Sequence, residues 1–186
     1  MATGLMIIGC GKATKKLGNF LNSSKEYVFE ASFGQSTDSY DAKGQITATT
    51  DYYPSQAQII AELDNFRGQI EQLPPAFSAL KVSGKRAYKL ARQGQKVNLE
   101  PRSVKIEELL LIDYYDHKAL FKVKCSKGTY VRSLAHDLGQ ACGSLAYVSQ
   151  LERTAIDQYQ LNQAISFENL AEAIAKQDFS HFINCD

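Results

Sequence analysis

The 186-residue sequence contains no tryptophan, only four cysteines and only three histidines. The cysteines form no C-x-x-C pair and the histidines are equally scattered, which excludes a disulfide framework and a zinc site. No apolar run is longer than Leu5–Ile8, which is far shorter than the roughly 18 residues of a membrane helix. No charged segment precedes a longer apolar stretch, as it does in a secretory signal peptide. We therefore expect a cytoplasmic protein without a metal or a membrane segment.

The chain also has little net charge. Its formal charge is +1, which gives no global attraction to nucleic acid or membrane. The charge is nevertheless unevenly distributed, because eight cations and one anion lie between Lys81 and Lys105. Such a stretch indicates a local phosphate-binding surface or, equally, a solvated lysine-rich face. Apolar residues make up 44% of the chain and charged residues 22%, which is typical of a folded globular domain.

Hydrophobic periodicity predicts both helices and strands. Helices are expected at 14–21, 55–67, 131–142 and 166–176, and strands at 27–33, 104–112 and 120–125. Ser55 and Gln58 form a capping-box pattern at the start of the second helix. In the last helix, Phe167, Leu170 and Ile174 are expected to face inward. No regular alternation of strand and helix is present, so the fold class is predicted to be α+β.

Three stretches are too specific to be ordinary loops or surface. The first is Lys25-x-Tyr27 followed by F-G-Q-S-T-D-S-Y-D-A-K-G at 33–44. The second is Q-L-P-P-A-F-S-A-L-K-V at 72–82, which continues into the basic stretch with aromatics interleaved. The third is C-S-K-G-T-Y-V-R-S-L-A at 125–135, where a strand end passes through a glycine into a helix that presents Tyr130 and Arg132.

With these motifs, the chain resembles the TruB-type bacterial tRNA pseudouridine synthases, which isomerise one uridine in the T-loop of tRNA. The resemblance also covers M-A-T-G-L at 1–5 and G-K-A-T-K at 11–15, and it runs from residue 1 to about residue 170. It implies a mixed, mainly antiparallel sheet flanked by helices. It also implies that the T-arm of tRNA is the partner and that no cofactor or metal is needed, and no obligate protein partner is evident.

The resemblance assigns roles to individual residues. Tyr27 matches the active-site tyrosine that packs on the flipped base and is a candidate for proton abstraction. Arg132 matches the arginine that ion-pairs with the catalytic aspartate, Tyr130 a second pocket tyrosine, and Leu151 an apolar residue lining the pocket. By charge alone, the candidates for phosphate contacts are Lys81, Lys85, Arg86 and Arg92, with Phe77 and Tyr88 as packing aromatics.

The resemblance also predicts that parts of the family's protein lie outside this chain. The segment G-H-T-G-x-L-D-P, which carries the catalytic aspartate, precedes the stretch that Met1 begins, and a C-terminal PUA domain usually follows beyond Asp186. We therefore expect residues 1–186 to form an incomplete catalytic domain that is inactive as given and that exposes an apolar sheet edge. Arg132 is expected to recruit another acid or an anion, or to become exposed. The alternatives are a non-catalytic RNA-binding module and a fragment without function.

Overall fold

The computed structural model describes residues 2–82 and 84–178. One seven-stranded sheet organises the fold, with the strand order β1-β10-β2-β9-β8-β5 and with β11 paired to β10. Its strands are β1 (Ala2–Gly4), β2 (Lys25–Phe33), β5 (Gly68–Gln72), β8 (Arg102–Tyr115), β9 (Lys118–Cys125), β10 (Ala146–Ile156) and β11 (Tyr159–Gln160). The β1–β10 pair is parallel and the other pairs are antiparallel. The expectation of a mixed, mainly antiparallel sheet in an α+β fold is confirmed.

Two short ribbons lie apart from this sheet. They are β3 (Gln35–Thr37) with β4 (Ile46–Thr49), and β6 (Lys81–Val82) with β7 (Lys85–Arg86). The helices are α1 (Leu17–Leu21), α2 (Gln56–Glu62), α3 (Ala87–Arg92), α4 (Val131–Ala141) and α5 (Phe167–Lys176). Tighter 3-10 turns lie at Gly11–Lys16, Leu63–Phe66 and Leu161–Gln163.

The predicted helix at 55–67 is present, but it changes type within its length. Ser55 caps α2 and exchanges hydrogen bonds with Gln58, so the capping box is confirmed. The last turn, Leu63–Phe66, tightens into a 3-10 helix before Gly68. The predicted helix at 14–21 divides in the same way, with its first part inside the 3-10 turn Gly11–Lys16 and only Leu17–Leu21 in α1.

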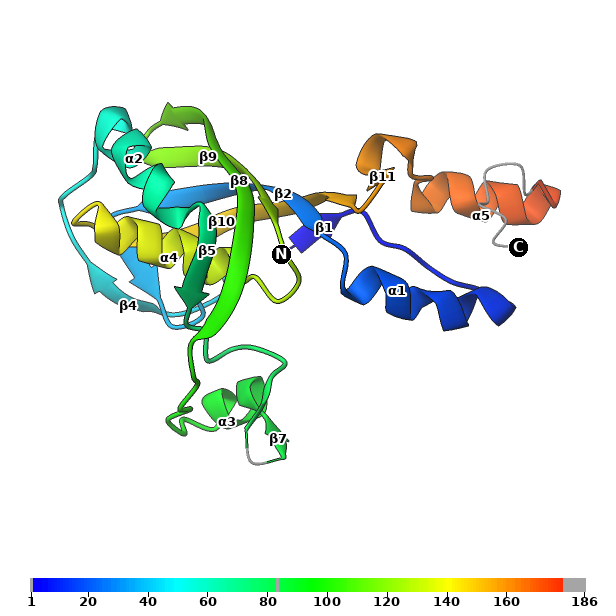
Figure 1. Ribbon diagram of the computed structural model, residues 1–186, viewed down its shortest axis with the longest axis horizontal. Helices are drawn as coiled ribbons and strands as arrows, with labels where there is room; N and C mark the ends of the chain where they lie inside the picture. Colours follow the sequence, from blue (N-terminus) through cyan, green and yellow to red (C-terminus); the bar gives the residue numbers. More distant parts are fainter. Residues whose placement is uncertain (1, 83, 179–186) are drawn as a thin grey trace.

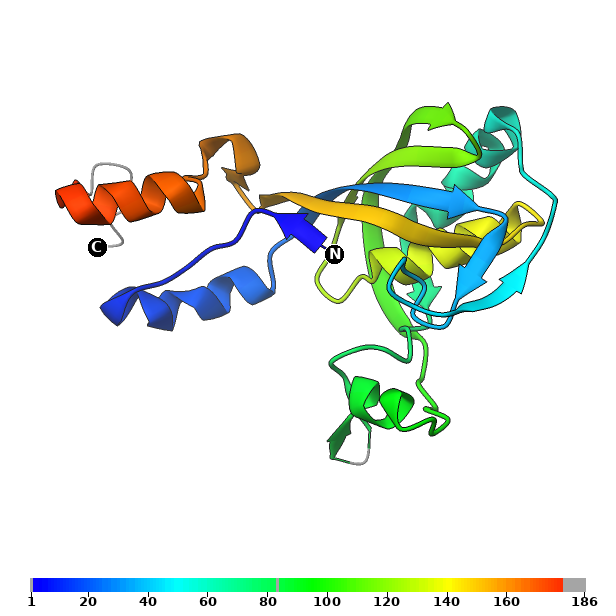
Figure 2. The same cartoon turned by 180° about the vertical axis from the view of Figure 1, so that it is seen from behind.

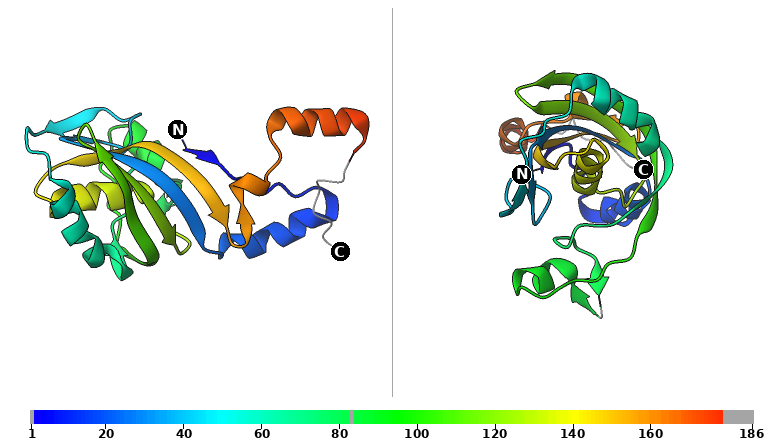
Figure 3. Two further views of the ribbon diagram at one scale, coloured as in Figure 1. Left: turned by 90° about the horizontal axis from the view of Figure 1, so that it is seen from above. Right: turned by 90° about the vertical axis from the view of Figure 1, so that its left-hand side faces the viewer.

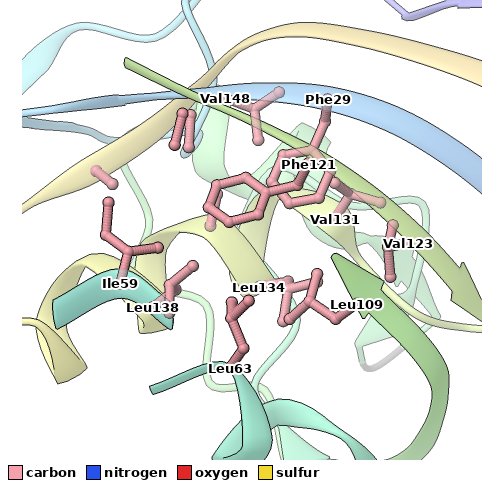
Figure 4. Close-up of a cluster of buried hydrophobic side chains, with 14 of the residues drawn as sticks. Phe29, Ile59, Leu63, Leu109, Phe121, Val123, Val131, Leu134, Leu138 and Val148 are labelled. Carbon is pink, nitrogen blue, oxygen red and sulfur yellow. The ribbon is translucent and has the colours of Figure 1, made fainter. Parts of the chain in front are cut away.

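The core lies between one face of the sheet and the helices α2 and α4 (Figure 4). Phe29 of β2 and Phe121 of β9 stack with ring centroids 5.0 Å apart, and Leu134 and Leu138 of α4 are fully buried against the sheet. Burying one such side chain contributes about 1.5–3 kcal/mol. The packing of α4 is close at Gly139, where a Cβ atom would lie 2.6 Å from the Ala146 backbone nitrogen.

The opposite face of the sheet is polar. Residues that alternate with the core positions along β2 and β9 form ion pairs there, including Lys122 with Glu26 at 2.9 Å and Lys118 with Glu30 at 3.3 Å. Helices α2 and α4 therefore cover only the apolar face of the sheet. Figure 3 shows the sheet curving around α4. The site described below lies on this same face, at the first turn of α4.

Three segments extend from the body formed by the sheet, α2 and α4 (Figures 1 and 2). The segments carrying α1 and α5 leave one end of the sheet, and the excursion carrying α3 and β7 projects separately. The expectation that Phe167 and Ile174 face inward is wrong, because their side chains are 74% and 56% exposed. The reason is that α5 lies past the end of the sheet, and Ala173 is its one buried residue. No helix in the described ranges is long and apolar enough to cross a membrane.

Candidate active site

Tyr27 and Leu151, the two residues that the resemblance assigns to the base pocket, come from neighbouring strands. In the β2–β10 ladder, Leu151 lies opposite Phe29, and Arg153 lies opposite Tyr27. Paired residues of an antiparallel ladder present their side chains on the same face. Tyr27 and Leu151 are half-buried and pack against the edge of the core cluster. Their uncovered surfaces therefore lie on one face of the sheet.

Tyr130 is the residue that precedes α4, and a buried glutamine holds it in place. The backbone nitrogen of Tyr130 donates to Gln72 Oε1 at 2.7 Å, and Gln72 Nε2 donates back to the Tyr130 carbonyl at 3.1 Å. Gln72 ends β5 and is 2% exposed. One turn further, Ser133 Oγ donates to the Leu73 carbonyl at 2.7 Å. The Pro-Pro loop after β5 is thereby fixed to the first turn of α4.

Replacing Gln72 by leucine is expected to lower the free energy of unfolding by about 1–3 kcal/mol, because the Tyr130 amide then loses its acceptor and the Tyr130 carbonyl keeps only the Leu134 amide as a donor. Urea denaturation followed by circular dichroism measures the loss. The matched control is Gln69→Leu on the same strand, since Gln69 is exposed and its amide bonds only to Ser103. Equal losses of stability in the two variants would show that the two hydrogen bonds between Gln72 and Tyr130 add no stability of their own.

Arg132 lies in the first turn of α4 and makes three contacts. Its Nη1 donates to the Ser39 carbonyl at 2.9 Å and to Asp41 Oδ2 at 3.2 Å, and its Nη2 donates to the Phe77 carbonyl at 2.9 Å. The side chains of Arg132 and Asp41 are only 21% and 17% exposed. The expectation that Arg132 recruits another acid is confirmed, and that acid is Asp41. The guanidinium thus joins all three sequence motifs at one point.

The loop that carries Asp41 is fixed by its own hydrogen bonds. Asp41 Oδ1 accepts from Ser39 Oγ at 2.8 Å and from the Lys43 amide at 3.0 Å, which leaves Oδ2 for Arg132. Asp38 Oδ1 accepts from the Gln45 amide at 3.0 Å. At Gly44, an added Cβ would lie 2.4 Å from both Asp38 Oδ1 and Ser39 Oγ, so a larger residue does not fit. Asp38 closes the loop, and Asp41 presents a carboxylate to the site.

One edge of β10 receives both this loop and the first strand. Asp41 forms a parallel bridge with Val148, and the Ala42 amide donates to the Val148 carbonyl at 3.0 Å. On the same edge, Ala2 of β1 lies opposite Leu151. The start of β1 and the Asp41–Arg132 pair are therefore only a few residues apart along one strand.

Aromatic stacking supports the acidic loop next to Arg132. The rings of Tyr40 and His136 stack with centroids 3.8 Å apart, and Ser36 Oγ lies 3.4 Å from His136 Nδ1. Burial lowers the pKa of His136, so its ring is neutral at pH 7, and burial raises the pKa of the Tyr40 hydroxyl. Burial also raises the pKa of the neighbouring Asp137 carboxyl to about 6.

The four phosphate-contact candidates lie on the excursion between β5 and β8, and all are exposed. Lys81, Lys85 and Arg86 line one open depression of about 470 Å³. Arg86 also donates to the Ala79 carbonyl at 2.5 Å, and the Arg92 guanidinium lies 5.5 Å from the Tyr88 ring centroid. This excursion projects away from the sheet (Figure 1), so the structure does not place the four cations beside Arg132.

The structure adds residues that sequence reasoning did not assign to the site. Gln72 and Asp41 stand inside quoted motifs, but only the three-dimensional contacts show that one holds Tyr130 and the other pairs with Arg132. Arg153 lies outside those motifs and was not a candidate. The sequence shows only an arginine two residues after Leu151. The pairing of β10 with β2 is needed to show that this arginine lies opposite Tyr27.

Comparison with known proteins identifies the family. The profile described as "TruB family pseudouridylate synthase (N terminal domain)" matches residues 1–131, and "tRNA pseudouridylate synthase B C-terminal domain" matches residues 132–182. The proteins called tRNA pseudouridine synthase B from Bacteroides fragilis and Phocaeicola vulgatus are 43% and 41% identical to this chain over 179 and 185 residues. The matches cover 96% and 99% of this chain and 77% and 79% of those proteins.

Among solved structures, the crystal structure of a Cbf5-Nop10-Gar1 complex contains a similar chain, with a TM-score of 0.68 and 25% identity. The match covers 95% of this chain but 44% of that one, so the present chain spans less than half of its length. Because one family profile covers most of the chain and relatives above 40% identity cover nearly all of it, this chain belongs to the TruB family of pseudouridylate synthases.

Proposed function

We propose that this chain takes part in the isomerisation of a T-loop uridine of tRNA to pseudouridine, and that it supplies the base pocket, the arginine and the RNA-binding surface. The catalytic carboxylate comes from a residue that precedes Met1 in the complete protein. The observation that carries the proposal is the position of Arg132, which is held with Asp41 on the β10 edge that β1 joins.

The pocket suits an extruded base. A base must leave the loop stack before its glycosidic bond can be reached, and stacking on aromatic and apolar faces offsets the cost of unstacking. Tyr27 and Leu151 offer such faces on adjacent strands, and Tyr130 stands at the start of α4. The pocket therefore combines surfaces for the base with hydrogen-bonding groups at one end.

The register of β1 supports an upstream carboxylate. The two chains of the β1–β10 pair run parallel, with Ala2 opposite Leu151 and Gly4 opposite Arg153. A continuation of β1 toward its N-terminus at this register runs along β10 toward Val148, where Asp41 is paired. A carboxylate on that continuation reaches Arg132 beside Asp41, and a guanidinium has enough donors for two carboxylates.

Residues matched by both family profiles build this one site. Leu151, Arg132 and β10 fall in the C-terminal profile, whereas Tyr27, Asp41 and β1 fall in the N-terminal one. Strand β10 lies between β1 and β2 in the sheet, so neither part completes the pocket alone. We therefore treat residues 1–186 as one incomplete catalytic domain.

The decisive experiment measures pseudouridine in a T-arm RNA hairpin. The 186-residue chain is expected to form no product, because Asp41 is already engaged by Arg132, Ser39 and Lys43. A version extended upstream by a G-H-T-G-x-L-D-P segment is expected to form product. Product from the unextended chain would contradict the upstream carboxylate, and Asp41→Asn would then identify the replacement. No product from either version, with hairpin binding retained, would favour a non-catalytic RNA-binding module.

The basic excursion is expected to provide the salt-sensitive part of RNA binding. Changing Lys81, Lys85 and Lys89 to glutamine should weaken T-arm binding and lower the slope of log K against log salt by about one for each phosphate that is no longer neutralised. Fluorescence anisotropy over a salt series measures both quantities. The control is Lys124→Gln, since that lysine is paired with Glu107 on the polar face of the sheet. An unchanged slope in the triple variant would show that these lysines are only solvated.

A further inference from the structure

Arg153 lies on β10, two residues after Leu151. It is the direct cross-strand partner of Tyr27, so its side chain lies on the face of the sheet that carries Tyr27 and Leu151. Its Nε and Nη2 donate to the Leu5 carbonyl at 2.8 and 2.6 Å. These two hydrogen bonds to one carbonyl fix the guanidinium like a fork. Its other N–H groups stay available to the Tyr27 hydroxyl. Because the site is half-buried, the positive charge is only partly screened by water.

The backbone of Arg153 also binds the residue that follows β1. The Leu5 amide donates to the Arg153 carbonyl at 2.8 Å, so Arg153 binds Leu5 through both main chain and side chain. Gly4 lies against the same residue, and an added Cβ would be 2.3 Å from the Arg153 carbonyl oxygen. One arginine therefore holds the residue that follows β1 and lies directly across the sheet from Tyr27.

The positive charge near Tyr27 is not neutralised by a paired acid. In the two described ranges, neither Arg153 nor Lys25 forms a salt bridge. Lys25 precedes Tyr27 by two residues and donates to the carbonyls of Phe20, Leu21 and Ser23 at 2.7–3.1 Å. Burial, and then the charge of Arg153, lower the pKa of Lys25. The two cations are thus close enough to interact and are held by neutral carbonyl groups.

From this geometry we propose that Arg153 is a positioning residue for the reaction, which holds the Tyr27 hydroxyl and the end of β1 in one fixed arrangement. A guanidinium that donates to the phenol oxygen leaves the O–H free to point toward the base, and it stabilises the oxygen when negative charge develops there. The consequence for catalysis rests on the proposed function, whereas the arrangement itself does not.

The groups that face Tyr27 make opposite contributions to its titration. Burial raises the pKa of the phenol, and the Cys125 thiol of β9 raises it further. Arg153 of β10 lowers it through charge and hydrogen bonding. Lys25 lies two residues before Tyr27 on the same strand, and the charges of Asp157 and Lys127 act in turn on Lys25. Removing the Arg153 charge should therefore raise the pKa of Tyr27, and no RNA is needed to observe this.

The test is a titration of the folded chain labelled with ¹³Cζ-tyrosine, in which Tyr27→Phe identifies the resonance. Arg153→Gln is expected to raise the Tyr27 pKa by about one unit or more, and Arg153→Lys, which keeps the charge but not the fork, should give a smaller rise. The control Glu152→Gln, an exposed neighbour on the opposite face, should leave it unchanged. An unchanged Tyr27 pKa in folded Arg153→Gln overturns the proposal. If that variant does not fold, an unchanged pKa in Arg153→Lys overturns it.

Activity separates this inference from the proposed function. In the upstream-extended version, Arg153→Gln is expected to lower kcat about tenfold or more while KM for the hairpin changes less than about twofold. A purely structural arginine would change hairpin binding and kcat together and leave the Tyr27 titration unaffected. If the extended wild-type protein forms no product, the proposed function fails, but the titration still decides whether Arg153 controls Tyr27.

Discussion

Replacing Arg132 by methionine is expected to lower the free energy of unfolding by about 3 kcal/mol, which is in the range measured when one partner of a buried ion pair is removed. The substitution leaves the Asp41 carboxylate, 17% exposed, without its cation, and it leaves the Ser39 and Phe77 carbonyls without their donor. In the upstream-extended version, product formation should fall about 100-fold or more, because the guanidinium no longer orients the acidic groups.

A double-mutant cycle separates the ion pair from the general loss of packing. Arg132→Met, Asp41→Asn and the double variant are compared by urea denaturation, and the coupling free energy is expected to be about 1 kcal/mol or more. Arg132→Lys keeps the charge but cannot reach Ser39, Asp41 and Phe77 at once, so it should recover only part of the stability. A coupling free energy near zero would contradict the view that Asp41 is the working partner of Arg132.

Replacing Gly4 by alanine is expected to detach β1 while the rest of the sheet stays folded. Gly4 has a φ of +96°, and an added Cβ would lie 2.3 Å from the Arg153 carbonyl oxygen and 2.7 Å from its nitrogen. Backbone strain alone costs about 1–3 kcal/mol, and the contact with main-chain atoms adds to it. A three-residue strand has few contacts to oppose that cost, so local opening relieves it.

Hydrogen exchange measures this detachment. The Leu5 amide, which donates to Arg153 at 2.8 Å, should lose its protection, whereas amides of β2 and β9 should keep theirs. In the upstream-extended version, product formation should be lost although hairpin binding persists. Gly11→Ala is the matched control, since Gly11 also has a positive φ of +56° but an added Cβ would meet nothing within 4 Å. Unchanged protection at Leu5 in Gly4→Ala would show that β1 tolerates the side chain.

Local residue patterns were enough to predict those helices and strands that depend on residues close together in the sequence. The Ser55–Gln58 box identified the start of α2, and the alternation of Tyr27, Phe29, Ala31 and Phe33 identified β2. Capping and period-two alternation depend on neighbours only a few residues away, so they can be recognised without the fold. The order of the three motifs likewise indicates the TruB family without any tertiary contact.

Strand β10 is not among the predicted strands, although it lies between β1 and β2 in the sheet. Its pairing with β2 shifts register between Val148 and Gln150 and again between Arg153 and Ala155. These irregularities break the alternation that marks a strand in sequence. Short strands such as β1 have too few residues to produce a pattern at all, and they exist because a longer strand offers an open edge.

Residue patterns were enough to indicate the α+β class, and the three motifs were enough to indicate the family. The resemblance to that family then supplied the candidates Tyr27, Tyr130, Arg132 and Leu151, whose roles stay predictions. They could not show that Arg132 pairs with Asp41, 91 residues away, or that Gln72 brackets Tyr130, 58 residues away. Nor could they show that Arg153 contacts Leu5, 148 residues away, or that α5 leaves Phe167 exposed. Such contacts depend on how strands from distant parts of the chain are ordered in the sheet, and no local residue pattern encodes that order.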